Sequence, residues 1–427
     1  MSHNSLLIIG FVWPEPKSSA AGSRMLQLIE QFQKQGYEVV FASAANTSDN
    51  TFNLNSSSVK TKSIVLNDSS FDIFISELNP SVVMFDRFMT EEQYGWRVAE
   101  QCPNALRVLD TEDFHGLRKA REAALKENTE VSITHLQNDI TKREIASIYR
   151  CDLSLIISEA EIEILTTQFK IDRSLLFYLP FLLEPIPIAI GTTDKIKQLP
   201  NFEARQHFIT IGNFLHAPNY DAVLYLKQTI WPLIRKQLLP IAIGTELHIY
   251  GAYESQKVTQ LNNKKEGFLI KGFAEDVNTV MQQAKVCLAP LRFGAGLKGK
   301  LVDAMQNGTP CIMSNIAAEG MFNIKERTLS DEEVNGFIED NPEAFAKKAV
   351  EIYTDSNIWK TKQKSGYTVL NKRFSKMNFE SDFSNKITEL ITTLKTHRQT
   401  NFIGQLLMHQ TLQSTKYMSK WIEEKNK

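Results

Sequence analysis

The chain has 427 residues, which exceeds what one hydrophobic core usually supports, so we expect two domains. Hydrophobic residues make up 42% and charged residues 23%, and this composition excludes both a disordered chain and a bundle of membrane helices. The formal net charge of -1 argues against broad nucleic-acid binding, because neutralising phosphates requires a basic excess.

The sequence shows no clear membrane-spanning segment, signal peptide or cysteine motif. The longest apolar runs are about nine residues, whereas a membrane crossing needs about 20. The start, Met1–Asn4, lacks the basic residues of a signal peptide. The four cysteines, Cys102, Cys151, Cys287 and Cys311, are scattered without a CxxC spacing, so neither a zinc site nor a disulfide scaffold is indicated. A reducing cytoplasm is the expected location.

The N-terminal half alternates short apolar runs with amphipathic stretches, a pattern typical of βαβ units and a parallel sheet. A helix is expected over Gly22–Gln35, closed by Gly36. The expected strands are Leu6–Gly10, Glu38–Ala42, Val82–Phe85, Leu106–Leu109 and Leu153–Ile157.

Three prolines between Glu184 and Gln206 interrupt both periodicities and indicate a domain boundary. A second α/β unit then begins. Its expected strands are Phe208–Gly212, Leu247–Tyr250, Gly267–Ile270, Val286–Ala289 and Pro310–Met313, and its expected helices are Asp221–Trp231, Val277–Ala284 and Lys300–Asn307. The predicted division is an N-terminal domain over 1–190, a C-terminal domain over 191–375 and a helical tail over 376–427. The last helix is expected to pack on one of the domains, with a membrane-surface helix as the alternative.

The segment from Ala289 to Pro310 carries the strongest functional signal. A strand enters a loop with three glycines, and the loop opens a helix whose free amides and partial positive charge favour an anion. Arg292, Lys298 and Lys300 add formal positive charge at the same place. The pattern predicts a diphosphate site. Asp303, one turn into that helix, either accepts hydrogen bonds from ribose or sugar hydroxyls or only compensates the helix dipole.

This segment, together with Phe208–Asp221 and Ile316–Met321, resembles the donor-binding domain of family-4 retaining glycosyltransferases (glycosyl transferases group 1) with the GT-B fold. The resemblance covers most of the chain. It implies two Rossmann-like parallel-sheet domains facing a cleft, and retaining transfer from a nucleotide sugar without a metal. Ser19–Arg24, before the first helix, is similar to the N-terminal glycine loop of that fold. The donor-binding residues implied are Gly22, Gly212, Asn213, Asn219, Gly272, Phe273, Arg292, Gly294, Gly296, Lys298, Lys300, Asp303 and Glu319.

The sequence departs from the family pattern at two places. Members commonly carry two glutamates flanking seven residues near this helix, whereas here the positions hold Ala295 and Asp303. Many members also place Arg after the glycine of the first C-terminal strand, where this chain has Gly212-Asn213. Lys298 and Lys300 are then expected to take over the contacts to the phosphates.

Polar residues follow the strand that ends at Leu109, where open α/β sheets build their clefts. Asp110, Glu112 and Arg118 are candidates for orienting the acceptor. Asp113 and His115, with Lys300, are candidates for catalysis, because an acceptor hydroxyl must lose its proton. The resemblance also allows the leaving phosphate to take that proton. Asp110-Thr-Glu112 alone is a weak metal signal, so no metal and no cofactor are expected.

The predicted activity is therefore transfer of a sugar from a nucleotide-sugar donor, a co-substrate, to a polysaccharide, glycolipid or other glycoconjugate precursor. An epimerase or hydrolase of nucleotide sugars on the same fold is the nearest alternative, and a non-catalytic sensor is another. Gly294–Gly299 also spells a dinucleotide fingerprint, which leaves an NAD-dependent oxidoreductase open. That fingerprint belongs to the first βαβ unit, however, and here at least three expected strands precede it. Contact with the inner face of the plasma membrane is expected only for a lipid-linked acceptor.

Overall fold

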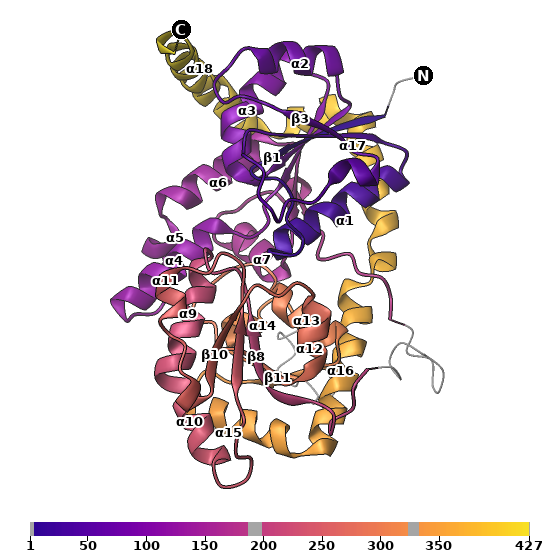
Figure 1. The fold of residues 1–427 in the computed structure, drawn as a ribbon. Coiled ribbons are helices and arrows are strands. Elements are labelled where there is room, and N and C mark those ends of the chain that lie inside the picture. The colour runs from indigo at the N-terminus through magenta and orange to yellow at the C-terminus, as the bar shows by residue number, and fades with distance from the viewer. Residues whose placement is uncertain (1–3, 187–198, 323–332, 427) are drawn as a thin grey trace.

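The computed structural model describes residues 4–186, 199–322 and 333–426, with the backbone alone for 410–413. The described chain forms two α/β lobes, one above the other in Figure 1, with helices of the C-terminal segment running along both. The predicted boundary between residues 190 and 191 lies outside the described residues.

The N-terminal lobe contains a parallel sheet in the order β3-β2-β1-β4-β5-β6-β7. Its strands are β1 (Ser5–Gly10), β2 (Glu38–Ser43), β3 (Lys60–Ser63), β4 (Val82–Asp86), β5 (Leu106–Asp110), β6 (Leu153–Ile156) and β7 (Leu176–Tyr178). Its helices are α1 (Ala20–Lys34), α2 (Ser70–Leu78), α3 (Arg87–Gln101), α4 (His115–Glu127), α5 (Ile133–Leu136), α6 (Asp139–Arg150) and α7 (Glu159–Thr167), with short 3-10 turns η1 (Leu54–Ser57) and η2 (Arg173–Leu175).

The C-terminal lobe contains a second parallel sheet in the order β10-β9-β8-β11-β12-β13. Its strands are β8 (Gln206–Ile211), β9 (Leu247–Tyr250), β10 (Phe268–Gly272), β11 (Ala284–Ala289), β12 (Cys311–Met313) and β13 (Gly336–Ile338). Its helices are α9 (Ala217–Tyr225), α10 (Trp231–Leu238), α11 (Gln256–Thr259), α12 (Val277–Gln283), α13 (Gly299–Gln306), α14 (Asn315–Ala318) and α15 (Pro342–Thr354), with a π turn η3 (Leu226–Ile230) and a 3-10 turn η4 (Lys264–Glu266). Each predicted strand is present to within a few residues at either end.

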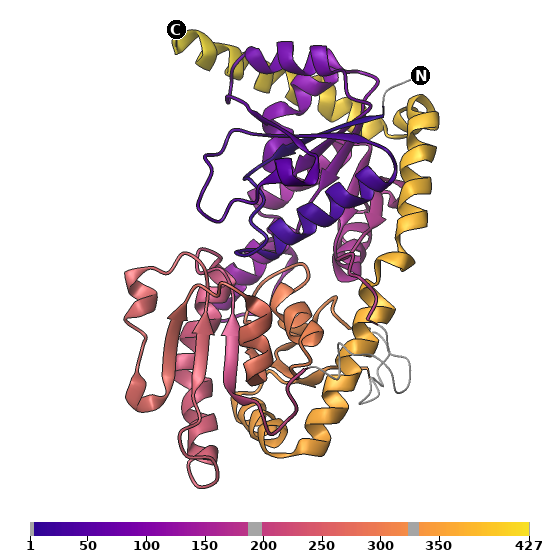
Figure 2. The ribbon, with the colours of Figure 1, turned by 45° about the vertical axis from the view of Figure 1, so that its right-hand side comes forward.

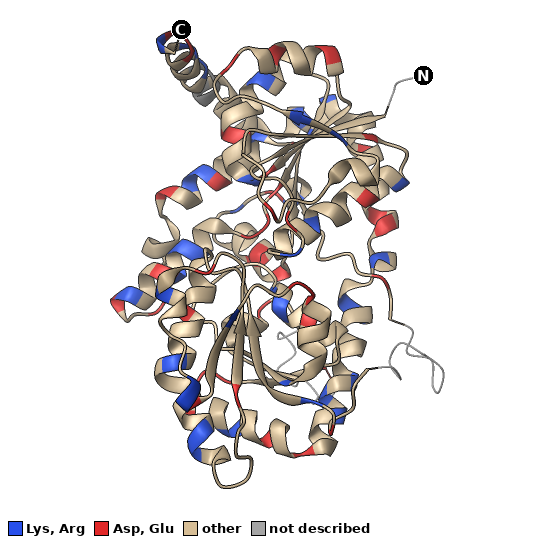
Figure 3. Ribbon diagram, viewed as in Figure 1, with Lys and Arg blue, Asp and Glu red and all other residues tan. Residues whose placement is uncertain are grey.

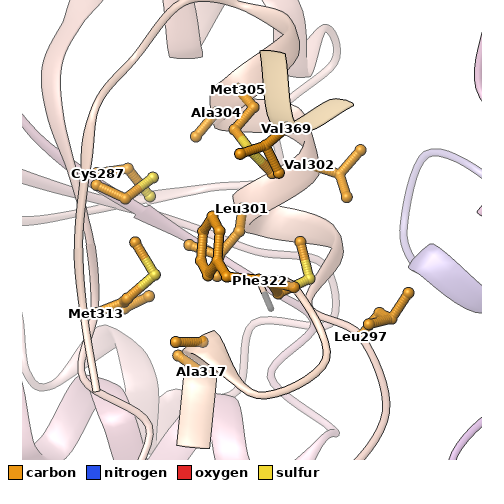
Figure 4. Close-up of a cluster of buried hydrophobic side chains, with 14 of the residues drawn as sticks. Cys287, Leu297, Leu301, Val302, Ala304, Met305, Met313, Ala317, Phe322 and Val369 are labelled. Carbon is orange, nitrogen blue, oxygen red and sulfur yellow. The ribbon is translucent and has the colours of Figure 1, made fainter. Parts of the chain in front are cut away.

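Both sheets carry apolar side chains on their two faces, as expected for parallel sheets covered by helices on both sides. Figure 4 shows part of the cluster under α13, to which Leu301 and Met305 of the helix and Met313 of β12 all belong. These contacts bury one face of α13 and hold its N-terminus at the edge of the sheet that faces the other lobe.

The C-terminal segment links the two lobes. Helix α16 (Ser356–Phe374) packs on the C-terminal lobe, a turn η5 (Lys376–Asn378) follows, and α17 (Glu380–Thr400) returns to the N-terminal lobe. There Phe383, Ile387 and Leu390 join the core that also contains β1. The last helix, α18 (Phe402–Lys425), lies against α3 and α6 (Figure 2). The predicted helical tail is confirmed, and it packs on the N-terminal lobe.

One local boundary differs from the prediction. The helix expected over Gly22–Gln35 begins two residues earlier, at Ala20, so most of the stretch Ser19–Arg24 that resembles a glycine loop belongs to α1. The Ser19 side chain caps the helix by accepting a hydrogen bond from the Gly22 amide at 3.1 Å. Gly22 therefore lies in the first helical turn, where a Cβ atom would fall 2.4 Å from the backbone of Glu15. The glycine is needed for this close approach, and not for an open loop.

Candidate active site

The carboxyl ends of the two sheets face each other, and charged residues of both signs lie where the lobes meet (Figure 3). From above comes the segment after β5, Thr111–Phe114, which leads into α4. From below comes the glycine-rich loop after β11, which leads into α13. The two segments touch, because a Cβ atom on Gly296 would lie 2.8 Å from the Cβ of Asp113. Gly296 also has a φ of +65°, so both space and backbone require glycine.

Two helix N-termini converge at this contact. A Cβ atom on Gly299, the first residue of α13, would lie 2.6 Å from the Cβ of Ala20, the first residue of α1. The amides of a first helical turn lack partners within the helix and carry a partial positive charge. Their convergence, one from each lobe, provides a favourable environment for an anion between the lobes.

The two lysines of the loop are buried at this interface, with 8% of Lys298 and 9% of Lys300 exposed. The Lys300 ammonium donates to Asn219 Oδ1 at 2.9 Å, whereas that of Lys298 donates to the carbonyls of Ala295 and Gly296 at 3.0 and 2.7 Å. Burial lowers the pKa of each lysine to about 8. An anion beside Lys300 would raise its pKa and favour its charged form. Lys298 instead stabilises the conformation of its own loop through its two hydrogen bonds.

The turn between β8 and α9 surrounds Lys300 from the other side. A Cβ atom on Gly212 would lie 2.6 Å from the Asn219 side chain, and the Asn219 amide donates to the Asn213 carbonyl at 3.0 Å. These contacts aim Asn219 Oδ1 at Lys300. Burial, followed by the charge of Arg118, lowers the pKa of His216 to about 4, so this histidine is neutral near neutral pH. His216 was not among the predicted site residues.

Asp113, His115 and Arg118 form one charged group in the N-terminal lobe. Arg118 donates to Asp113 at 2.5 Å, and His115 Nδ1 lies 3.2 Å from Asp113 and 3.4 Å from Glu144. Burial raises the pKa of Asp113, but Arg118 and His115 outweigh it and bring the value to about 2. Burial lowers the pKa of His115, and Asp113 with Glu144 outweighs it, so the histidine titrates above its ordinary value. An ionised carboxylate paired with Arg118 thus lies beside the loop, next to a histidine whose charged form is favoured.

Asp110 and Glu112 lie deeper in the N-terminal lobe. Asp110 Oδ1 accepts two hydrogen bonds from the guanidinium of Arg24, at 3.0 and 2.9 Å, in a pair that is almost fully buried. Burial, followed by the charge of Asp110, raises the pKa of Glu112 to about 8. Glu112 has a φ of +63° and lines a small cavity with Asp86, Arg87 and the first turn of α1. The structure thus places Asp110 in an ion pair and leaves Glu112 beside a cavity of about 20 Å³, which is room for about one water molecule.

Other predicted donor residues engage protein groups. Both Glu319 oxygens accept from Arg121, at 2.8 and 2.6 Å, across the two lobes. Arg292 pairs with Asp221 at 2.9 Å and is 38% exposed. Asp303 lies in α13, where burial raises its pKa to about 7. Gly272, with a φ of +73°, ends β10 and precedes Phe273. Their roles toward a donor remain predictions.

Sequence reasoning missed two residues that join the lobes. Arg121 donates to the Gly294 carbonyl at 2.8 Å as well as to Glu319. Glu161 in α7 accepts from the Gly296 amide at 2.7 Å, so this amide is not free for a phosphate in this arrangement. Helical spacing could have placed both on inward faces, but no local pattern connects them with a loop more than 130 residues away.

A cluster of possible metal ligands lies elsewhere. Within the described ranges, His207, Glu246 and His248 bring ligand atoms within 4.8 Å of one another. They stand at the amino ends of β8 and β9, opposite the end that faces the cleft. His207 Nδ1 already accepts the Glu246 amide at 3.1 Å. This group lies outside the candidate active site, where the absence of a metal stays a prediction.

Residues 205–355 match the family model described as Glycosyl transferases group 1. Among solved structures, sucrose-phosphate synthase from Thermosynechococcus elongatus superposes with a TM-score of 0.63 at 16% identity, covering 91% of this chain and 99% of that one. Anabaena HepE, solved with UDP-glucose, superposes with a TM-score of 0.61 at 12% identity, covering 91% and 99%. No curated protein matched the chain.

Staphylococcus aureus TarM, solved with Fondaparinux, alpha-GlcNAc-glycerol and UDP, superposes with a TM-score of 0.54 at 12% identity. The match covers 74% of this chain, which spans 58% of the length of TarM. At such identities the likeness concerns the fold. The predicted GT-B fold and the predicted resemblance to group 1 glycosyltransferases are confirmed. None of the described helices is long and apolar enough to span a membrane.

Proposed function

We propose that this glycosyltransferase, whose group 1 domain covers residues 205–355, binds a nucleotide sugar between its lobes and transfers the sugar with retention to a saccharide or lipid-linked acceptor. One observation carries the proposal. The buried ammonium of Lys300 and the N-termini of α1 and α13 meet in one place, opposite Asp113 and His115.

The chemistry follows from the charges at that place. A sugar leaves its nucleotide as the diphosphate gains negative charge, and fixed cations and helix dipoles stabilise that charge most effectively where water is excluded. Lys300 and the two helix ends supply this environment without a metal. The acceptor would lie against the N-terminal lobe, with its hydroxyl near Asp113 or His115, or near the departing phosphate, for removal of its proton.

The first experiment is a thermal-shift screen with UDP-, GDP-, ADP- and dTDP-sugars, because a ligand that binds only the folded state raises its apparent stability. UDP-glucose is the first donor to test, since HepE was solved with it. Turnover is then followed with and without saccharide acceptors, and the anomeric configuration of the product is read by NMR. Turnover that never requires an acceptor would replace transfer by epimerisation or hydrolysis, and an inverted product would refute retention.

The exposed side chains of α18 support contact with the membrane that would contain a lipid-linked acceptor. Its inward face carries the small residues Gly404 and Ser419, whereas Phe402, Tyr417 and Trp421 are each at least 60% exposed. Aromatic side chains favour the interface between lipid and water. In sedimentation with phosphatidylglycerol vesicles, the wild-type protein should be found in the pellet with the vesicles, and a Trp421→Ser variant should stay in the supernatant. Equal recovery of both in the supernatant would refute the contact.

A further inference from the structure

The carboxyl group of Glu161 joins the two halves of the candidate active site. Glu161 lies in the first turn of α7 and is fully buried, with 0% exposed. Its Oε1 atom accepts the amide of Phe114 at 2.9 Å, and the same atom accepts the amide of Gly296 at 2.7 Å. Phe114 belongs to the acceptor-side segment after β5, and Gly296 belongs to the glycine-rich loop after β11. One oxygen atom therefore fixes the distance between the two segments.

The N-terminal lobe holds three consecutive residues of this loop. Arg121 donates to the Gly294 carbonyl at 2.8 Å. Ala295 packs into the hydrophobic core of the N-terminal lobe, although it belongs to the other lobe. Glu161 accepts from Gly296. The loop conformation, and with it the start of α13, thus depends on contacts from the opposite lobe.

The bonding of Glu161 is unfavourable for a residue that serves stability alone. Within the described residues its second oxygen has no hydrogen-bond partner. Burial, followed by the charge of Asp113, raises the pKa of Glu161 to about 8. A buried carboxyl group with an unpaired oxygen costs free energy that a packed apolar side chain would not. What the carboxyl group provides, and an apolar side chain cannot, is an acceptor for two amides that belong to different lobes.

We propose that Glu161 is a positioning residue, which couples the glycine-rich loop of the C-terminal lobe to the acceptor-side segment of the N-terminal lobe and so sets the geometry of sugar transfer. This inference rests on the proposed function for its kinetic consequence. Its structural part concerns two amides and does not depend on which donor the protein uses.

Hydrogen–deuterium exchange tests the structural part. In the wild type, peptides containing Phe114 and Gly296 should both be protected. Glu161→Ala removes the acceptor, so exchange at both segments should rise at least tenfold. Glu161→Gln retains an oxygen in the same position and should keep the protection. The matched control is Glu91→Gln, another buried carboxylate, which accepts from Ser147 and Arg150 within the N-terminal lobe and should change neither segment.

Kinetics with UDP-glucose test the consequence. Glu161→Ala should lower kcat at least tenfold and change KM and the Kd for UDP by a smaller factor, because Lys300 and Asn219 hold each other within the C-terminal lobe without Glu161. Glu161→Gln should restore kcat to within threefold. If Glu161→Ala does not fold, Glu161→Asp takes its place, since its shorter side chain cannot reach both amides.

The two proposals fail in different ways. Unchanged exchange around Gly296 in Glu161→Ala, or equal damage by Glu161→Gln, would overturn the positioning role. A wild-type protein that turns over no nucleotide sugar, with the exchange pattern as expected, would overturn the proposed function and leave the coupling of the lobes established.

Discussion

Replacing Lys300 by Met should make the protein more stable and less able to bind a nucleotide diphosphate. The ammonium of Lys300 is buried, and its single hydrogen bond among the described residues goes to Asn219 at 2.9 Å. Burial lowers its pKa from 10.5 to about 8, which means that the folded protein without ligand holds this charge at a cost. Methionine fills similar space without a charge.

The magnitude follows from that shift. A change from 10.5 to about 8 corresponds to at most about 3 kcal/mol at pH 7. The substitution also leaves Asn219 Oδ1 without its donor, which costs about 1 kcal/mol, so the expected gain is about 1–2 kcal/mol. For a domain of this size that gain raises the Tm by roughly 2–8 °C.

The dependence on pH has a defined sign. Because the folded pKa lies below the unfolded one, the unfolded state binds more protons between about pH 8 and 10.5, so wild-type stability rises with pH across that range. The advantage of Lys300→Met should therefore be complete below pH 8 and disappear toward pH 10.5. Thermal unfolding at several pH values measures it, with the exposed Lys257→Met as control.

The same variant should bind UDP 10- to 100-fold more weakly by titration calorimetry, a loss of about 1.4–2.7 kcal/mol. Wild-type binding near pH 8 should also take up protons, as the phosphate raises the pKa of Lys300, and the variant should not. A lower Tm together with unchanged binding of UDP and other nucleotide diphosphates would refute the assignment of Lys300 to the anion site.

Three further substitutions test contacts on which the site depends. Arg24→Met should destabilise the protein by about 3–5 kcal/mol in chemical unfolding, because it leaves Asp110 buried and unpaired, and a milder effect would mean that water reaches the site. Gly296→Ala should abolish turnover and lower the free energy of unfolding. The control is Gly36→Ala, since Gly36 also has a positive φ but a Cβ atom there would meet no atom within 4 Å, so this variant should lose only about 1 kcal/mol of stability. Equal losses in the two variants would argue against close contact between the lobes. Arg121→Ala should increase the radius of gyration in small-angle scattering, and an unchanged radius would show that the other contacts suffice.

Hydrophobic periodicity located most of the secondary structure. Leu247–Tyr250 was predicted with the bounds that the structure has for β9, because Leu247 and Ile249 are apolar and buried and the residues that alternate with them are less buried. β3 (Lys60–Ser63) was missed, since all four residues are exposed at the sheet edge and carry no apolar signal. The helix expected from Gly22 starts at Ala20 instead, and Gly22 allows the backbone of Glu15 to lie close to its first turn, a contact that the local sequence does not indicate.

In the glycine-rich loop, some features follow from the local sequence and others from the tertiary structure. Its glycines and lysines predicted where a strand meets a helix, which the structure has between β11 and α13, and they predicted an anion site, which stays a prediction. The partners of those groups could not be inferred. Lys298 bonds its own loop, while Lys300 bonds Asn219.

Local pattern was thus enough for the two consecutive α/β units and the loop at the start of α13, since each depends on residues near one another in the chain. The GT-B arrangement of the two units was implied by the family resemblance. The contacts of Glu161 and Arg121 with that loop depend on how two separately built sheets face each other. That orientation arises from packing between distant segments, which leaves no periodicity in the sequence, and so the tertiary structure alone could assign these residues to the site.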